Sequence, residues 1–517
     1  MKRLAILLFL ATACGSAFGK IIVRGKIIAY DGKSKVAYIP TIEGIYAPYW
    51  LNVQPAPNGT FNIEYQNEGY GNVKVTYKSM TFRFFHDADS KIYFEFKEIP
   101  DWKSKQPKFS QERMYNVFDS LKKANIVKIT GDYADINQFY NQNLRSSYYT
   151  TNMTHGNYYS WVIFRAPTPA SALAKMDSLA QIEISQVEQM IGVEKSDPQV
   201  INFLKNEIYA FYAANFLNGL YLKRVTEIKA RGSDSTARPN IYNRDWEILV
   251  EQMKDQLQAL DPAPGSPDYT DFVEAMMMAM DEYQKYSFPK LENNTLDDWV
   301  SERLLHYDTT LLKDPKVRFG YELYGMNSFL GNQMMYSNTL LNAIKELQKK
   351  HPGSTHWKYY QPKIDALKAY LEKSVDSNII TDKYSTFPEL IKRFEGKNVF
   401  IDIWATWCRP CIEEFKYRSV LEPFVSRKDL SVLYISVDKP QVEDRWKKSI
   451  AANDLDGTHF RADKDFINDM WRTIGGAPGV IPRYVLIDKE GKIFNPAASP
   501  PSHAPDLTKE VRLLLAQ

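Results

Sequence analysis

The spacing of apolar residues changes twice along this chain, and this constrains the fold more than any other feature. Over residues 20–100, apolar and polar residues alternate, as at Phe61 and Ile63, which is typical of half-buried strands. Over 101–380, apolar residues recur three or four positions apart, as in helices. Strand and helix patterns then alternate over 381–517. A chain of 517 residues with three such patterns is too long for one core, so we expect a multidomain protein.

Each pattern predicts its own class of domain. The first predicts a small antiparallel β domain, a sandwich or barrel, and the second an all-α domain in which Ile201–Leu222 is a central, buried helix. In the third, Val399–Trp404 reads as a buried strand followed by a helix from about Pro410. A hairpin around Lys489-Glu490-Gly491 follows later. This order indicates an α/β sandwich with at least one parallel crossover.

Residues 1–19 have the pattern of a secretory signal. Lys2 and Arg3 precede a short apolar stretch and then small residues, which indicates cleavage near Gly19 and a soluble, exported (periplasmic) mature protein. Cys14 leaves lipid anchoring open, but a lipobox usually has Leu where this chain has Ala11, so anchoring is the less favoured alternative. No later stretch is apolar for long enough to span a membrane.

The charge balance argues against a polyanionic partner for the chain as a whole. Lys and Arg total 65 and Asp and Glu total 62, so the formal net charge is +3. Removal of Lys2 and Arg3 with the signal would leave 63 cations against 62 anions. A chain this close to neutrality has no global field that would attract nucleic acid, and we expect no nucleic-acid partner.

Cleavage would also leave only two cysteines, Cys408 and Cys411, in the Trp407–Cys411 segment where the strand meets the helix. Exported proteins stabilised by disulfides normally have several cysteines spread along the chain, so a single close pair points to redox chemistry. The helix N-terminus and Arg409 both favour the thiolate of Cys408, which makes it the expected nucleophile. Cys411, one turn further in, is the expected resolving cysteine.

Resolution of a mixed disulfide needs a proton acceptor, and Asp402 is the candidate. It lies on the apolar strand six residues before Cys408, where burial should raise the pKa of its carboxyl. Glu413 and Glu414 read as solvated carboxylates of the first helical turn, although they could also raise the thiol pKa.

These residues carry a family resemblance. Lys397–Cys411 reads KNVFIDIWATWCRPC and resembles the signature of the thioredoxin superfamily. Within it, residues 381–517 are most similar to the exported TlpA- and ResA-like disulfide reductases of bacteria. The resemblance implies a thioredoxin-like fold and assigns Asp402 to the buried acid of the family.

The resemblance also implies substrate-binding residues and partners. Ile481-Pro482 resembles the cis-proline loop, which in the family faces the cysteine pair and binds substrate backbone. Trp407, Arg409 and Pro410, beside the cysteines, are the other expected substrate contacts. The implied partners are protein disulfide clients and a membrane thiol carrier that donates electrons; the implied activity is the reduction of protein disulfides, with no cofactor other than the cysteine pair itself. Neither the oligomeric state nor the direction of electron flow follows from the sequence.

Two alternatives are weighed against this hypothesis. A zinc site would need about four ligands, and the sequence offers no second Cys pair or close His pair, so we expect no metal. The chain could instead be a scaffold whose upstream domains bind a peptide or glycan, with an accessory thioredoxin-like domain. Exposed aromatic surface over 101–378 would favour that alternative.

Overall fold

The computed structural model describes residues 19–78, 80–97, 127–142, 164–191, 197–231, 244–287, 296–307, 309, 312–332, 335–373, 378–427, 429–475 and 479–517. Apart from Gly19, the expected signal peptide, including Cys14, lies outside these residues. The chain divides into two compact units: the described residues up to Ser328 with Leu347–Tyr359, and Phe329–Glu346 with Tyr360–Gln517. No helix in the described ranges is both long and apolar enough to cross a membrane.

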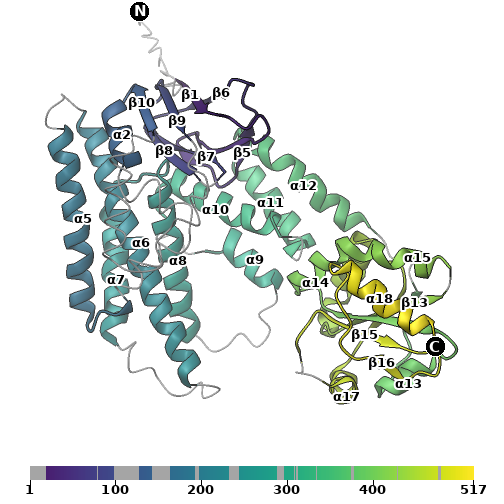
Figure 1. Ribbon diagram of the computed structural model, residues 1–517. Helices are drawn as coiled ribbons and strands as arrows, with labels where there is room; N and C mark the ends of the chain where they lie inside the picture. Colours follow the sequence, from purple (N-terminus) through teal and green to yellow (C-terminus); the bar gives the residue numbers. More distant parts are fainter. Residues whose placement is uncertain are drawn as a thin grey trace, which may run out of the picture. The chain divides into compact units, whose positions relative to one another are not determined.

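The first unit contains a β-sandwich (Figure 1). One sheet has the strand order β10-β9-β1-β6, and the other has β5-β2-β7-β8. A single apolar cluster takes side chains from both sheets, including Phe94 from the first and Phe82 from the second, so the sheets pack face to face. The strands of this unit are β1 (Gly19–Ile28), β2 (Val36–Ile39), β3 (Thr41–Ile42), β4 (Ile45–Tyr46), β5 (Leu51–Val53), β6 (Thr60–Asn67), β7 (Gly71–Tyr77), β8 (Met80–His86), β9 (Lys91–Lys97) and β10 (Val127–Gly131).

The sandwich departs from the sequence prediction in two ways. β9 pairs with β1 in parallel, with Ile22 opposite Lys91 and Ile28 opposite Lys97, so the sheets are not purely antiparallel. Alternation of apolar residues reveals a strand but not the direction of its partner, and the short turn from β8 to β9 joins two different sheets. In addition, β10 lies within the range expected to be helical and pairs with β9.

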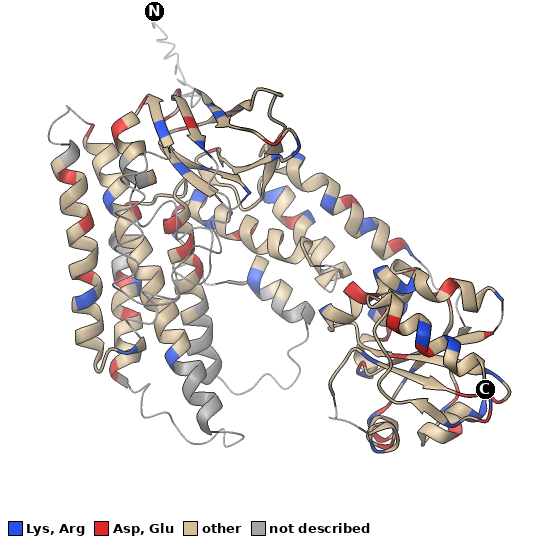
Figure 2. Ribbon diagram, viewed as in Figure 1, with Lys and Arg blue, Asp and Glu red and all other residues tan. Residues whose placement is uncertain are grey.

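Long helices make up most of the rest of the first unit (Figure 1). α5, α6, α7 and α8 share one apolar cluster, and α6 is apolar around most of its circumference, as the sequence predicts for Ile201–Leu222. The helices up to residue 372 are α2 (Ala134–Gln142), α5 (Pro169–Ile191), α6 (Pro198–Arg231), α7 (Arg244–Ala259), α8 (Pro267–Ser287), α9 (Leu296–Leu305), α10 (Pro315–Leu330), α11 (Asn338–Lys350) and α12 (Trp357–Glu372). Basic and acidic positions are interspersed along these helices in their described portions (Figure 2).

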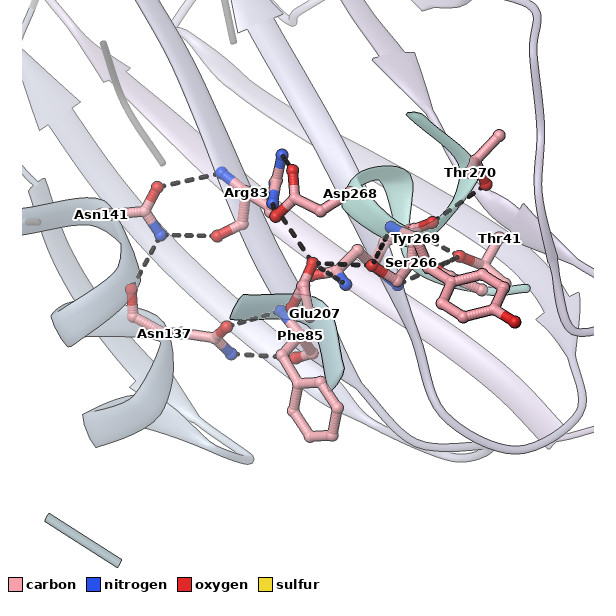
Figure 3. A network of polar contacts seen from close by, with 12 residues as sticks. Thr41, Arg83, Phe85, Asn137, Asn141, Glu207, Ser266, Asp268, Tyr269 and Thr270 are labelled. Atoms are coloured by element: carbon pink, nitrogen blue, oxygen red, sulfur yellow. Dashed lines mark hydrogen bonds and ion pairs between the residues drawn. The ribbon is translucent and has the colours of Figure 1, made fainter. Parts of the chain in front are cut away.

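β8 is buried on both faces and connects the sandwich to the helices. Its arginine, Arg83, is the centre of a buried ionic network (Figure 3). The Nη1 of Arg83 lies 2.7 Å from Oδ2 of Asp268 on α8 and 3.2 Å from Oε1 of Glu207 on α6. Asn72 of β7 and Ser266 also donate hydrogen bonds to Oε1 of Glu207. Buried charges require such partners, so the network fixes two helices against the strand.

The backbone N–H and C=O groups at the outer edge of β8 form hydrogen bonds with side chains rather than with another strand. Asn141 of α2 accepts a hydrogen bond from the backbone N–H of Arg83 and donates one to its carbonyl. Asn137, one helical turn earlier, does the same for Phe85 (Figure 3). Two asparagines on one helix face thus replace a strand partner and protect the sheet edge.

The second unit contains an α/β sandwich. Its six-stranded sheet has the order β11-β14-β13-β12-β15-β16, in which β12 is parallel to β13 and antiparallel to β15. One apolar cluster covers each face: α13 and α17 contribute to one, and α16 and α18 to the other. The elements are β11 (Asn378–Ile379), α13 (Phe387–Lys392), β12 (Asn398–Trp404), α14 (Arg409–Glu414), η2 (Phe415–Leu421), α15 (Glu422–Val425), β13 (Leu430–Ser436), η3 (Pro440–Val442), α16 (Glu443–Ala452), β14 (Thr458–Arg461), α17 (Lys464–Ile474), β15 (Arg483–Ile487), β16 (Ile493–Asn495) and α18 (Ala504–Leu515).

Candidate functional site

The central strand of the second unit leads directly into the cysteine pair. β12 is fully buried, and its alternation places Phe400, Asp402 and Trp404 on one face of the sheet. Phe400 and Trp404 belong to the apolar cluster that also contains Cys408 and Cys411. Asp402 therefore faces the same core as the two cysteines.

Cys408 and Cys411 form a disulfide at the start of α14, with 5.3 Å between their Cα atoms. The prediction that the two sulfurs can join is confirmed. Cys408 is the N-cap of the helix, and its Sγ accepts a hydrogen bond of 3.2 Å from the N–H of Cys411. Cys408 is 4% exposed and Cys411 is 0% exposed, so the outer sulfur belongs to Cys408. A sulfur that accepts a helix N–H is placed for stabilisation as a thiolate.

The residues expected to contact substrate surround this outer cysteine. Trp407 is 59% exposed, and Arg409 and Pro410 are also exposed. The Ile481–Pro482 peptide bond is cis, as the family resemblance implies. Ile481 packs against the apolar cluster that contains both cysteines, so a segment far along the chain reaches the same core.

A buried aspartate that the sequence analysis missed anchors the approach to the pair. Asp438 accepts hydrogen bonds from the backbone N–H of Thr406 at 2.9 Å and from the Thr406 hydroxyl at 2.8 Å. The hydroxyl of Ser436 donates to the same carboxylate at 2.8 Å. Asp438 comes two residues after β13, and its position after a buried strand was the available signal. These bonds fix the loop from which Cys408 projects.

Asp402 lies between two tyrosines at the same level of the sheet. Tyr434 on β13 and Tyr484 on β15 are its direct cross-strand partners. The carboxyl is buried, and within the described residues no hydrogen-bond partner is found for its Oδ1. Burial, and secondly the negative charge of Glu414, raise the pKa of Asp402 well above its ordinary value. The structure thus places a buried carboxyl with a raised pKa on the strand that leads to the cysteine pair.

Glu414 has a hydrogen-bond partner that the sequence does not predict. Its carboxylate is half-buried and accepts hydrogen bonds from Ser502, one of 2.9 Å from the N–H and one of 2.7 Å from the hydroxyl. Glu413, the next residue back, instead forms an exposed ion pair with Arg409. Neighbouring glutamates on a helix point in different directions, and of these two it is the charge of Glu414 that contributes to the raised pKa of Asp402.

Replacement of Asp402 by Asn is expected to change how stability depends on pH. Below the ordinary pKa of 3.8, the carboxyl is protonated in both the folded and the unfolded chain, and its contribution to stability is fully retained. As the pH rises, the unfolded chain ionises first, so wild-type stability is lost until the pH passes the raised pKa of the folded state. Asp402→Asn should remove this loss and be more stable than wild type at high pH, by about 1–3 kcal/mol.

Amide hydrogen exchange of β12 would measure this effect, because it reports on the local stability of the strand. Asp465→Asn, an exposed position in the first turn of α17, is the matched control and should follow the wild-type pH dependence. Equal stability of wild type and Asp402→Asn across the whole pH range would contradict a raised pKa at this carboxyl.

Substitutions of Glu414 and Glu413 should have different effects on the pKa of Asp402. Glu414→Gln removes a negative charge that disfavours ionisation of Asp402, so the pKa of Asp402 should fall. Glu413→Gln removes the same charge one residue away, where the side chain is paired with Arg409, and should leave Asp402 unchanged. A pH titration of the carbon-13 signal of the Asp402 carboxyl would measure the pKa of Asp402 in both variants and in the wild type. Identical titrations for the two variants would show that Glu414 has no special influence.

No group of three or more His, Cys, Asp or Glu side chains placed to hold a metal ion occurs in the part of the chain that the structure describes.

Comparisons with known proteins match the C-terminal region. A family model described as Redoxin matches residues 388–509. The thiol-disulfide oxidoreductase ResA of Bacillus thuringiensis subsp. konkukian is 31% identical over 127 residues, which are 25% of this chain and 69% of the relative. ResA of Geobacillus thermodenitrificans is 29% identical over 101 residues, 19% of this chain and 53% of the relative. The crystal structure of the thioredoxin domain of a thiol-disulfide oxidoreductase from Bacteroides vulgatus is similar at 26% identity and a TM-score of 0.21, covering 24% of this chain and 83% of that one.

Proposed function

Since this chain belongs, through its C-terminal region, to the thiol-disulfide oxidoreductases with a Redoxin domain, we propose that it reduces protein disulfides outside the cytoplasm through Cys408 and Cys411. The observation that carries this proposal is the disulfide-bonded pair at the start of α14, with the buried Asp402 on the strand before it. We also propose that the mature chain begins after residue 19, with a lipid anchor at Cys14 as the alternative.

The proposed reaction transfers two electrons and needs no cofactor beyond the cysteine pair. In the reduced enzyme, the thiolate of Cys408 attacks one sulfur of a client disulfide, and the other client sulfur leaves as a thiolate. Cys411 then gives its proton to the carboxylate of Asp402 and attacks Cys408, so the enzyme disulfide forms and the client leaves fully reduced. A thiol carrier in the membrane returns two electrons to the enzyme, and Asp402 returns the proton.

The exposed residues around Cys408 are proposed to bind the client. Trp407, Arg409 and Pro410 provide an accessible surface beside the sulfur. The backbone of Ile481, before the cis bond to Pro482, is proposed to pair with the client chain. For the whole chain, we propose a division into a signal (1–19), a β domain that includes β10 in addition to residues 20–100, a helical domain after β10, and a thioredoxin-like domain (381–517).

The direction of electron flow is tested by the reduction potential of the pair. Equilibration with mixtures of reduced and oxidised glutathione, followed by counting of free thiols, gives the potential. A reductase should lie well below about −200 mV, on the thioredoxin side of the known range, whereas a value near about −120 mV would indicate an oxidant.

The scaffold alternative makes a different prediction for the full-length chain. If the upstream regions bind the clients and the dithiol is accessory, the double variant Cys408→Ala/Cys411→Ala should retain wild-type client affinity. If the dithiol defines the function, Cys411→Ala should capture clients covalently. The double variant should then capture none of these clients. Retention of the same clients at the same affinity would favour the scaffold.

A further inference from the structure

The β-sandwich carries a hollow on its outer surface, lined by both charged and apolar side chains and far along the chain from the cysteine pair. The hollow lies on the sheet β10-β9-β1-β6, and its volume is about 770 Å³. A volume of this size is ordinary for a small-molecule or oligomer site. The segment that includes Gln54 and Ala56, after β5, also lines it.

Strand register shows how the floor of the hollow is built. On this sheet the outward-facing residues alternate with the buried core, and two rows of them cross all four strands. The first row consists of Thr130, Tyr93, Arg24 and Asn62, each directly opposite the next. The guanidinium carbon of Arg24 lies 5.8 Å from the centre of the Tyr93 ring, which is itself 38% exposed. An accessible aromatic ring and a cation therefore stand side by side.

The second row is more strongly charged. It consists of Lys128, Glu95, Lys26 and Thr60, again in direct register. The Nζ of Lys26 is 3.8 Å from Oε1 of Glu95, and both side chains are about half exposed. Two lysines thus flank one glutamate, and within the described residues an ion pair is found for Lys26 but not for Lys128.

Together the two rows bring three cations and one anion into the hollow, which favours an anionic ligand. The uncharged side chains and the single carboxylate of the hollow indicate the chemical class of this ligand. Asn62 and Thr60 already donate hydrogen bonds to Glu64 and Asn58, but their side-chain oxygens can accept further bonds from ligand hydroxyls. The partly exposed ring of Tyr93 can contact a sugar ring. Glu95 can accept hydrogen bonds from sugar hydroxyls, which a polyphosphate does not offer.

Two other classes of macromolecule fit less well. A peptide that adds a strand pairs with the backbone of an edge strand, whereas the hollow extends across the face of the sheet from one edge strand, β10, to the other, β6. A nucleic-acid site normally belongs to a strongly basic domain or stripe, whereas this chain has 65 cations against 62 anions.

We propose that the hollow binds an acidic oligosaccharide, with Arg24, Lys26 and Lys128 recognising its carboxylate or sulfate groups and Tyr93 contacting a sugar ring. The site goes beyond the redox function and does not depend on it. Arg24 can bind a carboxylate or sulfate with two parallel hydrogen bonds, and this geometry makes it the principal anchor.

The test is isothermal titration of the full-length chain with three probes: a hexasaccharide of galacturonic acid, a sulfated hexasaccharide derived from heparin, and a neutral galactose hexasaccharide. We expect one or both acidic probes to bind and the neutral probe to bind at least about tenfold more weakly. The double variant Arg24→Gln/Lys128→Gln should weaken acidic binding about tenfold or more. Lys33→Gln/Lys35→Gln, which removes the same charge at an exposed turn outside the hollow, should bind as wild type does.

Several outcomes would overturn the proposal. They are an absence of binding by both acidic probes, equal binding of the neutral probe, and unchanged binding by the Arg24→Gln/Lys128→Gln variant. A single-stranded DNA oligonucleotide that binds more tightly than either acidic sugar would also overturn it, in favour of a nucleic-acid site. Because the substituted side chains are exposed, an unchanged thermal unfolding curve should establish that the variants are folded.

Discussion

Cys408→Ser should abolish the reduction of disulfide-bonded test proteins, such as insulin, by the full-length chain. The hydroxyl of serine does not attack a disulfide, and the other cysteine among the described residues, Cys411, is 0% exposed. Turnover with dithiothreitol as the electron donor should fall by on the order of 10³-fold or more, to the rate of the donor alone. The serine is nearly the size of cysteine, so the fold of the second unit should be preserved.

Cys411→Ser is the informative companion variant. Its nucleophile is intact, so it should still attack a client disulfide, but it cannot resolve the product and should also lose turnover. Its first reaction with client should remain fast, whereas that of Cys408→Ser should be absent. Turnover by Cys408→Ser near the wild-type rate, or a fast first step in that variant, would contradict the assignment of the nucleophile.

Arg83→Met should have the largest effect on stability of any single substitution proposed for the first unit. Methionine is similar in length but removes the charge that lies between Glu207 and Asp268, and both carboxylates are buried. Breaking a buried ion pair from one side typically costs 3–5 kcal/mol, because it leaves charge in a medium that solvates it poorly. Urea unfolding, followed by hydrogen exchange of β8 and α6, should show a loss of about that size.

Two control variants distinguish the ionic network from a general effect of substitution. Lys205→Met removes a partly exposed cation from α6, which pairs with Glu188, and should cost less than about 1 kcal/mol. Adding Glu207→Gln and Asp268→Asn to Arg83→Met should restore part of the lost stability, since the two buried negative charges that faced the arginine are then removed. A loss for Arg83→Met no larger than that for Lys205→Met would contradict the role assigned to the network.

The second unit shows which structural features local sequence patterns determine. The buried strand at Val399–Trp404 and the helix from about Pro410 are confirmed as β12 and α14. The hairpin around Lys489-Glu490-Gly491 is confirmed as β15 and β16. Each depends on residues close in sequence, where period and turn chemistry are decisive. The cysteine pair was also predictable, because spacing of three at a helix start is a local property.

Features that depend on distant residues were not predictable in the same way. The interaction of Glu414 with Ser502 joins positions 88 residues apart, and nothing in the local pattern distinguishes Glu414 from Glu413. Arg83 and Asp268 are 185 residues apart, and an arginine within an aromatic strand gives no indication of its partners. The parallel pairing of β1 and β9 has the same origin, because strand partners are chosen by the tertiary fold.

The central claim is that Cys408 is the sulfur that meets the client, and covalent trapping tests it most directly. Full-length chain with Cys411→Ala, reduced and then mixed with a disulfide-bonded test protein, should accumulate a mixed disulfide, and peptide mapping should place it at Cys408. The reciprocal variant, Cys408→Ala, should trap little or none, because Cys411 is fully buried. Equal trapping by the two variants, or no mixed disulfide with Cys411→Ala, would contradict the account.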